Sequence, residues 1–144
     1  MGKTGIAKVF SAELEGIDAR KIEVETDLHV GLHSFTIVGL ADKALSESKE
    51  RINAALKNTG VKAPNKEHRK VIVNLAPADV KKTGSQYDLA IAIGFLLASG
   101  QIKQFATKEY LFVGELALDG SVRAVTGAMS IALLAKKLGI HALA

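Results

Sequence analysis

Two stretches near the start of the chain alternate between apolar and polar residues. Residues 6–16 and 20–28 both follow a two-residue period, which is typical of strands with one face on a core and one face in water. We therefore predict a hairpin. In the second stretch the apolar positions alternate with Glu23, Glu25 and Asp27. We interpret this acidic row as a solvated face, because no compact set of further ligands accompanies it to bind a metal.

The most apolar part of the chain combines a β-branched run at 70–75 with a helical pattern at 88–99. The helical pattern is apolar on every side, which is typical of a central helix covered by other elements, and it is too short to span a membrane. A polar loop at 76–87 joins the two. We expect the carboxylate of Asp88 to cap the start of the helix by accepting backbone N–H bonds.

The remaining elements complete one domain over residues 1–144. Their order, β-β-β-α-β-α-β-β-α followed by the beginning of a strand, predicts an α+β fold with a mixed sheet and three main helices. Because the chain stops where this last strand begins, we expect it to be a fragment of a longer protein. The predicted elements outside the hairpin and the central unit are a strand at 34–38, a helix at 42–58, a strand at 110–118, a two-residue turn at Asp119 and Gly120, a strand at 121–125, and a helix at 128–138.

The composition narrows the classes of protein. The chain has no cysteine and no tryptophan, which excludes a disulfide framework and a thiolate metal site. Its four histidines lack the spacing of metal ligands, so we expect no metal. We also find neither a spanning apolar run nor a signal-peptide core, which fits a cytoplasmic protein without a membrane partner.

The net charge of +4 is concentrated in the middle of the chain, where residues 43–82 carry ten basic and four acidic side chains. The candidate nucleic-acid or phosphate contacts lie at the two ends of the predicted strand 70–75 and are Lys62, Lys66, Arg69, Lys70, Lys81, Lys82 and Ser85. A six-residue strand is about 20 Å long, so this distribution favours a long polyanion over a compact phosphate. The alternative is that these lysines are simply solvated on connecting loops.

Binding by these basic residues should be weak, sensitive to salt and indifferent to sequence, because the aromatic residues that stack on single strands are missing from this region. A second candidate phosphate-binding motif is Gly2-Lys3-Thr4, which resembles the end of a P-loop. It lacks the upstream strand and glycine-rich turn that cradle phosphates. We therefore expect the chain by itself not to hydrolyse ATP.

Several stretches together resemble the N-terminal domain of the magnesium-chelatase-like AAA+ ATPases of the bacterial ComM (YifB) type. The resemblance covers nearly the whole chain. Its most specific segments are GLHSFTIVGL at 31–40 and the combination of NLAPAD at 74–79, KKTGS at 81–85 and the pair Asp88-Leu89; VETD at 24–27, ESKERI at 47–52 and GELALDG at 114–120 also match.

This resemblance implies a Lon-protease-like fold, a β-α-β arrangement shared with a ribosomal-protein domain. It also implies that the domain precedes an ATPase module of the same polypeptide that this chain lacks. ATP and Mg²⁺ would belong to that module, and no cofactor is expected for the domain itself. In the family the module forms homo-oligomeric rings, and the ComM proteins are associated with processing DNA taken up during natural transformation.

Lon cleaves peptides with a Ser–Lys dyad, and the resemblance allows a residue-by-residue comparison. The Lon serine loop corresponds to residues 82–88, with Gln86 at the nucleophile position and Ser85 one place early. The second Lon signature matches 114–122 and places Met129 at the lysine position. A dyad needs a hydroxyl and a neutral amine within hydrogen-bond reach. The comparison therefore favours a domain without catalytic residues.

Three functions remain as hypotheses. The first is a non-catalytic accessory domain of an AAA+ ATPase that serves ring assembly or contacts DNA or a partner protein. The second is a stand-alone, weak nucleic-acid-binding module that uses the basic region 62–82. The third is an active Ser–Lys hydrolase, which Met129 disfavours. No residue supports magnesium insertion into a porphyrin.

Overall fold

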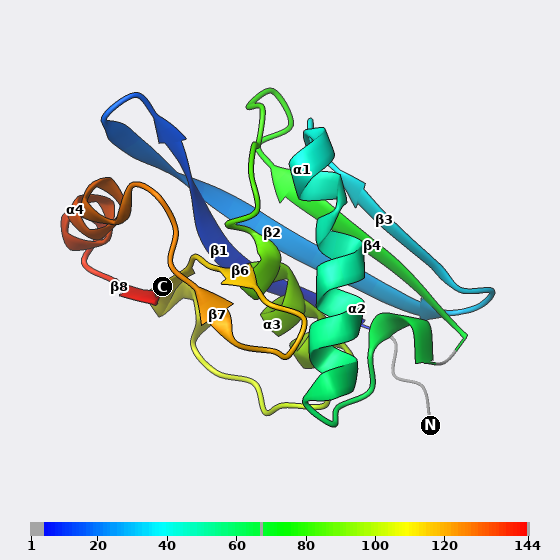
Figure 1. Ribbon diagram of the computed structural model, residues 1–144. Coiled ribbons are helices and arrows are strands. Elements are labelled where there is room, and N and C mark those ends of the chain that lie inside the picture. The colour runs from blue at the N-terminus through cyan, green and yellow to red at the C-terminus, as the bar shows by residue number, and fades with distance from the viewer. Residues whose placement is uncertain (1–4, 67, 144) are drawn as a thin grey trace.

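A four-stranded mixed sheet forms the centre of the molecule (Figure 1). The computed structural model describes residues 5–66 and 68–143, so the P-loop-like residues Gly2, Lys3 and Thr4 lie outside it. The sheet has the order β1-β2-β4-β3, and only the β3–β4 pair is parallel. Its strands are β1 (Gly5–Glu15), β2 (Asp18–Val30), β3 (Ser34–Val38) and β4 (Arg69–Ala76). The predicted hairpin and mixed sheet are confirmed.

The strand register explains why the predicted acidic row is on the solvent side. Val24 of β2 lies opposite Val9 of β1 and Leu75 of β4, and all three are buried. The intervening residue Glu25 is partly exposed, and Lys8 lies 3.8 Å from it across the strand pair. The outer face of β1 differs from the prediction, because Ala12 there is buried in a second apolar cluster with residues of the C-terminal helix.

The central helix α3 (Asp88–Ala98) packs over β1 and β2, with α2 beside it (Figure 1). Ile91 and Phe95 are completely buried, which confirms the prediction of a helix covered on all sides. The approach to β2 is close at Gly94, where an added Cβ would lie 2.7 Å from Thr26 Oγ1. A glycine at this position lets the helix backbone sit directly on the sheet.

The helix predicted at 42–58 is two helices, α1 (Lys43–Ser46) and α2 (Ser48–Asn58), separated at Glu47. Asp42 caps α1 by accepting a 2.8 Å hydrogen bond from the Leu45 backbone N–H. Arg51 Nη2 donates to the carbonyl oxygen of Ala44 at 3.3 Å. Side chains thus supply contacts beside the break, and periodicity alone could not locate it because both helices present their apolar residues to the same core.

The C-terminal third differs from the predicted continuous strand at 110–118. β5 (Tyr110–Phe112) and β6 (Glu115–Leu116) belong to different two-stranded sheets, in which β6 pairs with β7 (Val122–Arg123) and β5 pairs in parallel with β8 (His141–Leu143). The Ala117 N–H group donates to the Ser121 carbonyl oxygen at 2.8 Å. Because these two residues are paired, the turn between β6 and β7 contains three residues rather than the predicted two.

The predicted helix at 128–138 is α4 (Ala128–Leu138), and it lies beside the far end of the β1–β2 hairpin (Figure 1). The predicted final strand is β8. Two short 3₁₀ helices, η1 (Pro64–Lys66) and η2 (Thr107–Glu109), complete the secondary structure of the described residues. None of the helices in this part of the chain combines the length and apolar character needed to cross a membrane.

Candidate functional site

A cleft of about 450 Å³ opens where the two segments that resemble Lon signatures meet. The backbones of these segments are hydrogen-bonded, because Gly114 N donates to Gln86 O at 2.9 Å and Leu89 N donates to Gly114 O at 3.1 Å. The cleft is lined by residues of β1, the loop before α3, β6, β7 with the segment after it, and α4: Ala12, Glu13, Leu14, Thr83, Gly84, Ser85, Gln86, Glu115, Arg123, Ala124, Val125, Thr126 and Ile131. It is the position at which a hydrolytic site would be expected.

Glu13 is buried at the edge of this cleft and holds the loop before α3 in place. Its Oε1 accepts hydrogen bonds from Thr83 N at 3.0 Å and Tyr87 Oη at 2.6 Å, and its Oε2 accepts from Thr83 Oγ1 at 2.8 Å. Burial, followed by the hydrogen bond to Glu13, raises the pKa of Tyr87 above its ordinary value. No sequence pattern indicates this role of Glu13, because its partners lie about 70 residues further along the chain.

The described residues that line the cleft do not supply both groups of a Ser–Lys dyad. Ser85 and Gln86 both line it, but Met129 does not and is 73% exposed on α4. Among the described residues, the lining of this cleft includes neither a lysine nor a histidine. Its cation is Arg123, whose Nε lies 3.9 Å from Glu115 Oε2, and a guanidinium does not give up its proton in proteins. The described residues of the cleft can bind polar groups, but they include no amine to activate Ser85.

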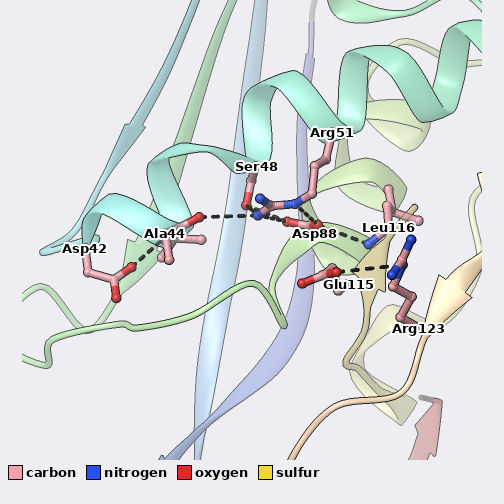
Figure 2. A network of polar contacts seen from close by, with 9 residues as sticks. Asp42, Ala44, Ser48, Arg51, Asp88, Glu115, Leu116 and Arg123 are labelled. Carbon is pink, nitrogen blue, oxygen red and sulfur yellow. Dashed lines mark hydrogen bonds and ion pairs between the residues drawn. The ribbon is translucent and has the colours of Figure 1, made fainter. Parts of the chain in front are cut away.

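Asp88 does not cap α3, so that prediction was wrong. Tyr87 occupies the cap position and makes no side-chain cap bond. The Asp88 side chain is instead completely buried and accepts four hydrogen bonds (Figure 2): from Ser48 Oγ at 2.5 Å, Arg51 Nε at 2.6 Å, Arg51 Nη2 at 3.0 Å and Leu116 N at 3.0 Å. It joins α2, α3 and β6, and the cleft-lining Glu115–Arg123 pair lies beside it in Figure 2.

The guanidinium of Arg51 neutralises this buried carboxylate and donates hydrogen bonds to it. The Arg51 side chain is itself mostly buried, with 21% of it exposed. The hydrogen bonds to Asp88 raise the pKa of Arg51, against a smaller opposing effect of burial. Arg51 therefore keeps its positive charge over the whole pH range in which the protein can be studied. The sequence did not indicate this pair, because an aspartate at the start of a helix is readily explained as a helix cap.

Two of the seven predicted nucleic-acid contacts are buried, so they are not part of an exposed basic surface. Lys82 is completely buried, and its Nζ donates to the carbonyl oxygens of Gly39, at 2.7 Å, and Pro77. Burial lowers the pKa of Lys82. Arg69 is 4% exposed and places its guanidinium 5.6 Å from the centre of the Phe95 ring. Sequence cannot distinguish these cations from their exposed neighbours Lys70 and Lys81.

The other predicted contacts are distributed over separate places. Lys62 and Lys66 line a second cavity, of about 500 Å³, together with Lys57. Lys70 is exposed on β4, Lys81 is exposed beyond the other end of that strand, and Ser85 belongs to the first cleft. The structure therefore brings Lys62 and Lys66 together but not the whole set, and the nucleic-acid contact stays a prediction.

Comparison with known proteins shows the family to which the chain belongs. Residues 24–144 match the family described as subunit ChlI of Mg-chelatase, and the chain belongs to this family. It is 42% identical over 132 residues to the competence protein ComM of Haemophilus influenzae, covering 92% of this chain and 25% of that protein.

Two further relatives are also about four times as long as the part that this chain matches. Identity to YifB of Escherichia coli is 44% over 124 residues, covering 86% of this chain and 24% of that protein. Identity to Mb2921c of Mycobacterium bovis is 37% over 134 residues, covering 93% and 26%. The chain thus spans about a quarter of the length of the curated relatives it matches.

Proposed function

We propose that this chain is a non-catalytic N-terminal domain, with a Lon-protease-like fold, of a magnesium-chelatase-like AAA+ ATPase. Its role is to serve ring assembly or to contact DNA or a partner protein. The family match and the size of the relatives support the first part, and the name of the H. influenzae relative, a competence protein, supports a setting in DNA processing.

The observation that carries the proposal is the chemistry of the first cleft. Ser85 is its candidate nucleophile, and none of the described residues that line the cleft with it is a lysine or histidine base. Glu13, the buried carboxylate of the cleft, already accepts hydrogen bonds from Thr83 and Tyr87. Losing one member of a catalytic unit typically costs about 10⁴–10⁶ in rate. The polar groups of the cleft hold the fold together instead.

A role in protein contact is supported by an apolar stripe on α4. Met129 and Leu133 are one turn apart on this helix and are 73% and 58% exposed. Ile17, at the tip of the β1–β2 hairpin, is 88% exposed and lines one shallow cavity with Leu133. Ser130 Oγ donates to Ile17 O at 2.5 Å and fixes the hairpin tip beside α4. Contiguous exposed apolar residues of this kind mark protein-interaction sites.

Light scattering after size-exclusion chromatography tests the assembly role. The average molecular mass measured for the wild type should rise with protein concentration, because the chain self-associates. The variant Met129→Ser/Leu133→Ser should remain monomeric. Leu118→Ser/Val122→Ser is the matched control, since it also replaces two exposed apolar residues but leaves the stripe intact. Equal masses for the wild type and both variants at every concentration would show that the stripe does not mediate self-association.

A further inference from the structure

We propose that two lysine-bearing loops, residues 57–66 and 100–108, form one surface that binds the phosphate backbone of nucleic acid. The inference deepens the proposed DNA contact and rests on it. It replaces the strand-long arrangement expected from the sequence with a surface at one end of the molecule, where the turn after α2 meets the segment that follows α3 (Figure 1).

The two loops are held together by one side chain. The Lys62 backbone N–H donates to Gln101 Oε1 at 2.8 Å, and Gln101 Nε2 donates back to the Lys62 carbonyl at 2.8 Å. Gln101 Nε2 also lies 3.0 Å from Ser99 Oγ, at the end of α3. Because the contact uses the backbone of Lys62, the orientation of the loops does not depend on its ammonium group. The lysine side chains are therefore carried by two loops that hydrogen bonds hold together.

The surface is predominantly basic, although a glutamate directly follows each loop in the sequence, Glu67 after the first and Glu109 after the second. Neither loop contains an aspartate or glutamate, and the five lysines of the two loops are all exposed: Lys57, Lys62, Lys66, Lys103 and Lys108. Three of them, Lys57, Lys62 and Lys66, line the cavity of about 500 Å³, whose other described lining residues are uncharged. Like charges gathered in this way repel one another, and a polyanion that neutralises them releases its own condensed counterions.

Three cations elsewhere among the described residues have acidic or carbonyl partners. Lys8 lies within 3.4 Å of Glu23, Arg123 lies 3.9 Å from Glu115, and the ammonium of Lys82 is buried against carbonyl oxygens. The two loops together carry five exposed lysines. Of the contacts predicted from sequence, this surface keeps Lys62 and Lys66 and adds three lysines that the sequence analysis did not single out.

The chemistry of the surface favours phosphates over bases and over an acidic protein. Phe105 is the one aromatic residue in the two loops, and its ring already lies edge-on to Tyr110 and Phe112, with centroids 5.9 and 6.0 Å away. It is thus poorly placed to stack on a base. Protein–protein interfaces are depleted in lysine and enriched in arginine and aromatic residues, whereas lysine is an ordinary phosphate ligand that acts as a point charge.

Fluorescence anisotropy with a labelled DNA duplex of about 30 base pairs tests the surface at salt concentrations from about 25 to 200 mM. The wild type should bind with a log–log salt slope of about −3 to −5. The loop variant Lys57→Ala/Lys62→Ala/Lys66→Ala should reduce the magnitude of that slope by about two to three. The control variant Lys81→Ala/Lys136→Ala/Lys137→Ala removes the same net charge from exposed positions elsewhere and should leave the slope nearly unchanged.

The outcomes separate the surface from the broader function. Equal losses in the two triple variants would overturn the two-loop surface while leaving a non-specific DNA contact in place. Absence of binding by the wild type at the lowest salt would overturn the DNA contact itself. Equally tight binding of polyglutamate, with the same dependence on the three loop lysines, would overturn the selection of a nucleic-acid backbone over an acidic protein. Unchanged thermal unfolding of the loop variant would confirm that only the surface had been altered.

Discussion

Arg51 and Asp88 lie 37 positions apart in the chain and form a side-on ion pair in the interior, with Nε–Oδ2 and Nη2–Oδ1 distances of 2.6 and 3.0 Å. The pair joins the first turns of α2 and α3. Leu116 N adds β6 to the same carboxylate. One aspartate therefore connects three elements, and one of them, β6, lines the cleft through Glu115.

The two members of this pair should differ in their effect on stability. Arg51→Met leaves a completely buried carboxylate without its cation, which should lower the free energy of unfolding by about 3–5 kcal/mol. Asp88→Asn should cost less, about 1–3 kcal/mol, because an amide oxygen can still accept from Ser48 or Leu116 and because Arg51 is partly exposed. Urea unfolding of both variants and of the double variant gives the coupling energy.

The Arg123–Glu115 pair is the control for this cycle, because its arginine side chain is 67% exposed. Arg123→Met should change the free energy of unfolding by no more than about 1 kcal/mol. Additive effects of Arg51→Met and Asp88→Asn would contradict a direct interaction between the two side chains.

Lys82 should matter for stability and its neighbour Lys81 should not. Lys82→Met keeps the buried aliphatic stem but leaves the Gly39 and Pro77 carbonyls without their donor, which should cost about 1–3 kcal/mol. Lys81→Met, at an exposed position, should stay within about 0.5 kcal/mol. Chemical denaturation of the two variants checks this difference, and equal midpoints would refute the structural role of Lys82.

Tyr87 should make stability fall in alkaline solution. Its pKa is raised in the folded protein, mainly by burial and then by the bond to Glu13, so above pH 10 the unfolded chain loses this proton first. The stabilising contribution is complete below pH 10, the ordinary value of the group, and is lost as the pH rises from there toward the raised folded value. Tyr87→Phe should remove this part of the slope, as measured by urea unfolding between about pH 9 and 11. An unchanged slope would exclude Tyr87 as its source.

Gly94→Ala should destabilise the protein although alanine is the better helix former by about 1 kcal/mol. The new Cβ would lie 2.7 Å from Thr26 Oγ1, so α3 or β2 would have to move. Adding Thr26→Ala removes the obstructing hydroxyl and should recover part of the loss in melting temperature. A Gly94→Ala protein that melts higher than the wild type would show that the helix does not approach the sheet this closely.

Local patterns were sufficient to predict much of the fold. The alternation in β2 identified its buried face, and the continuous apolar pattern of α3 identified the central helix, since both reflect the burial of consecutive residues. The break at Glu47 and the separation of β5 from β6 were not predicted. The separation of β5 from β6 coincides with a hydrogen bond to a distant residue, from Gly114 N to Gln86 O. The break at Glu47 lies between two helices whose apolar residues pack in the same core, so periodicity does not reveal it.

The candidate site was predictable to a smaller extent. The comparison of Gln86 and Met129 with the Lon dyad directed attention to the cleft that the structure contains. The roles of Glu13, Arg51 and Lys82 could not be predicted, because a charged residue in the sequence carries no indication of its burial or of a partner elsewhere in the chain. Asp88 is the clearest example. Its place at the start of a helix suggested a capping role, whereas its side chain forms a buried ion pair with Arg51.

Cleavage of an unfolded protein tests the absence of catalysis most directly. Labelled casein would be incubated with the wild type, with Ser85→Ala and with a heat-denatured sample, and the release of label followed over hours. We predict the same background release from all three, because no amine base among the described residues lines the cleft beside Ser85. Release by the wild type that disappears in Ser85→Ala would contradict the assignment of a non-catalytic domain.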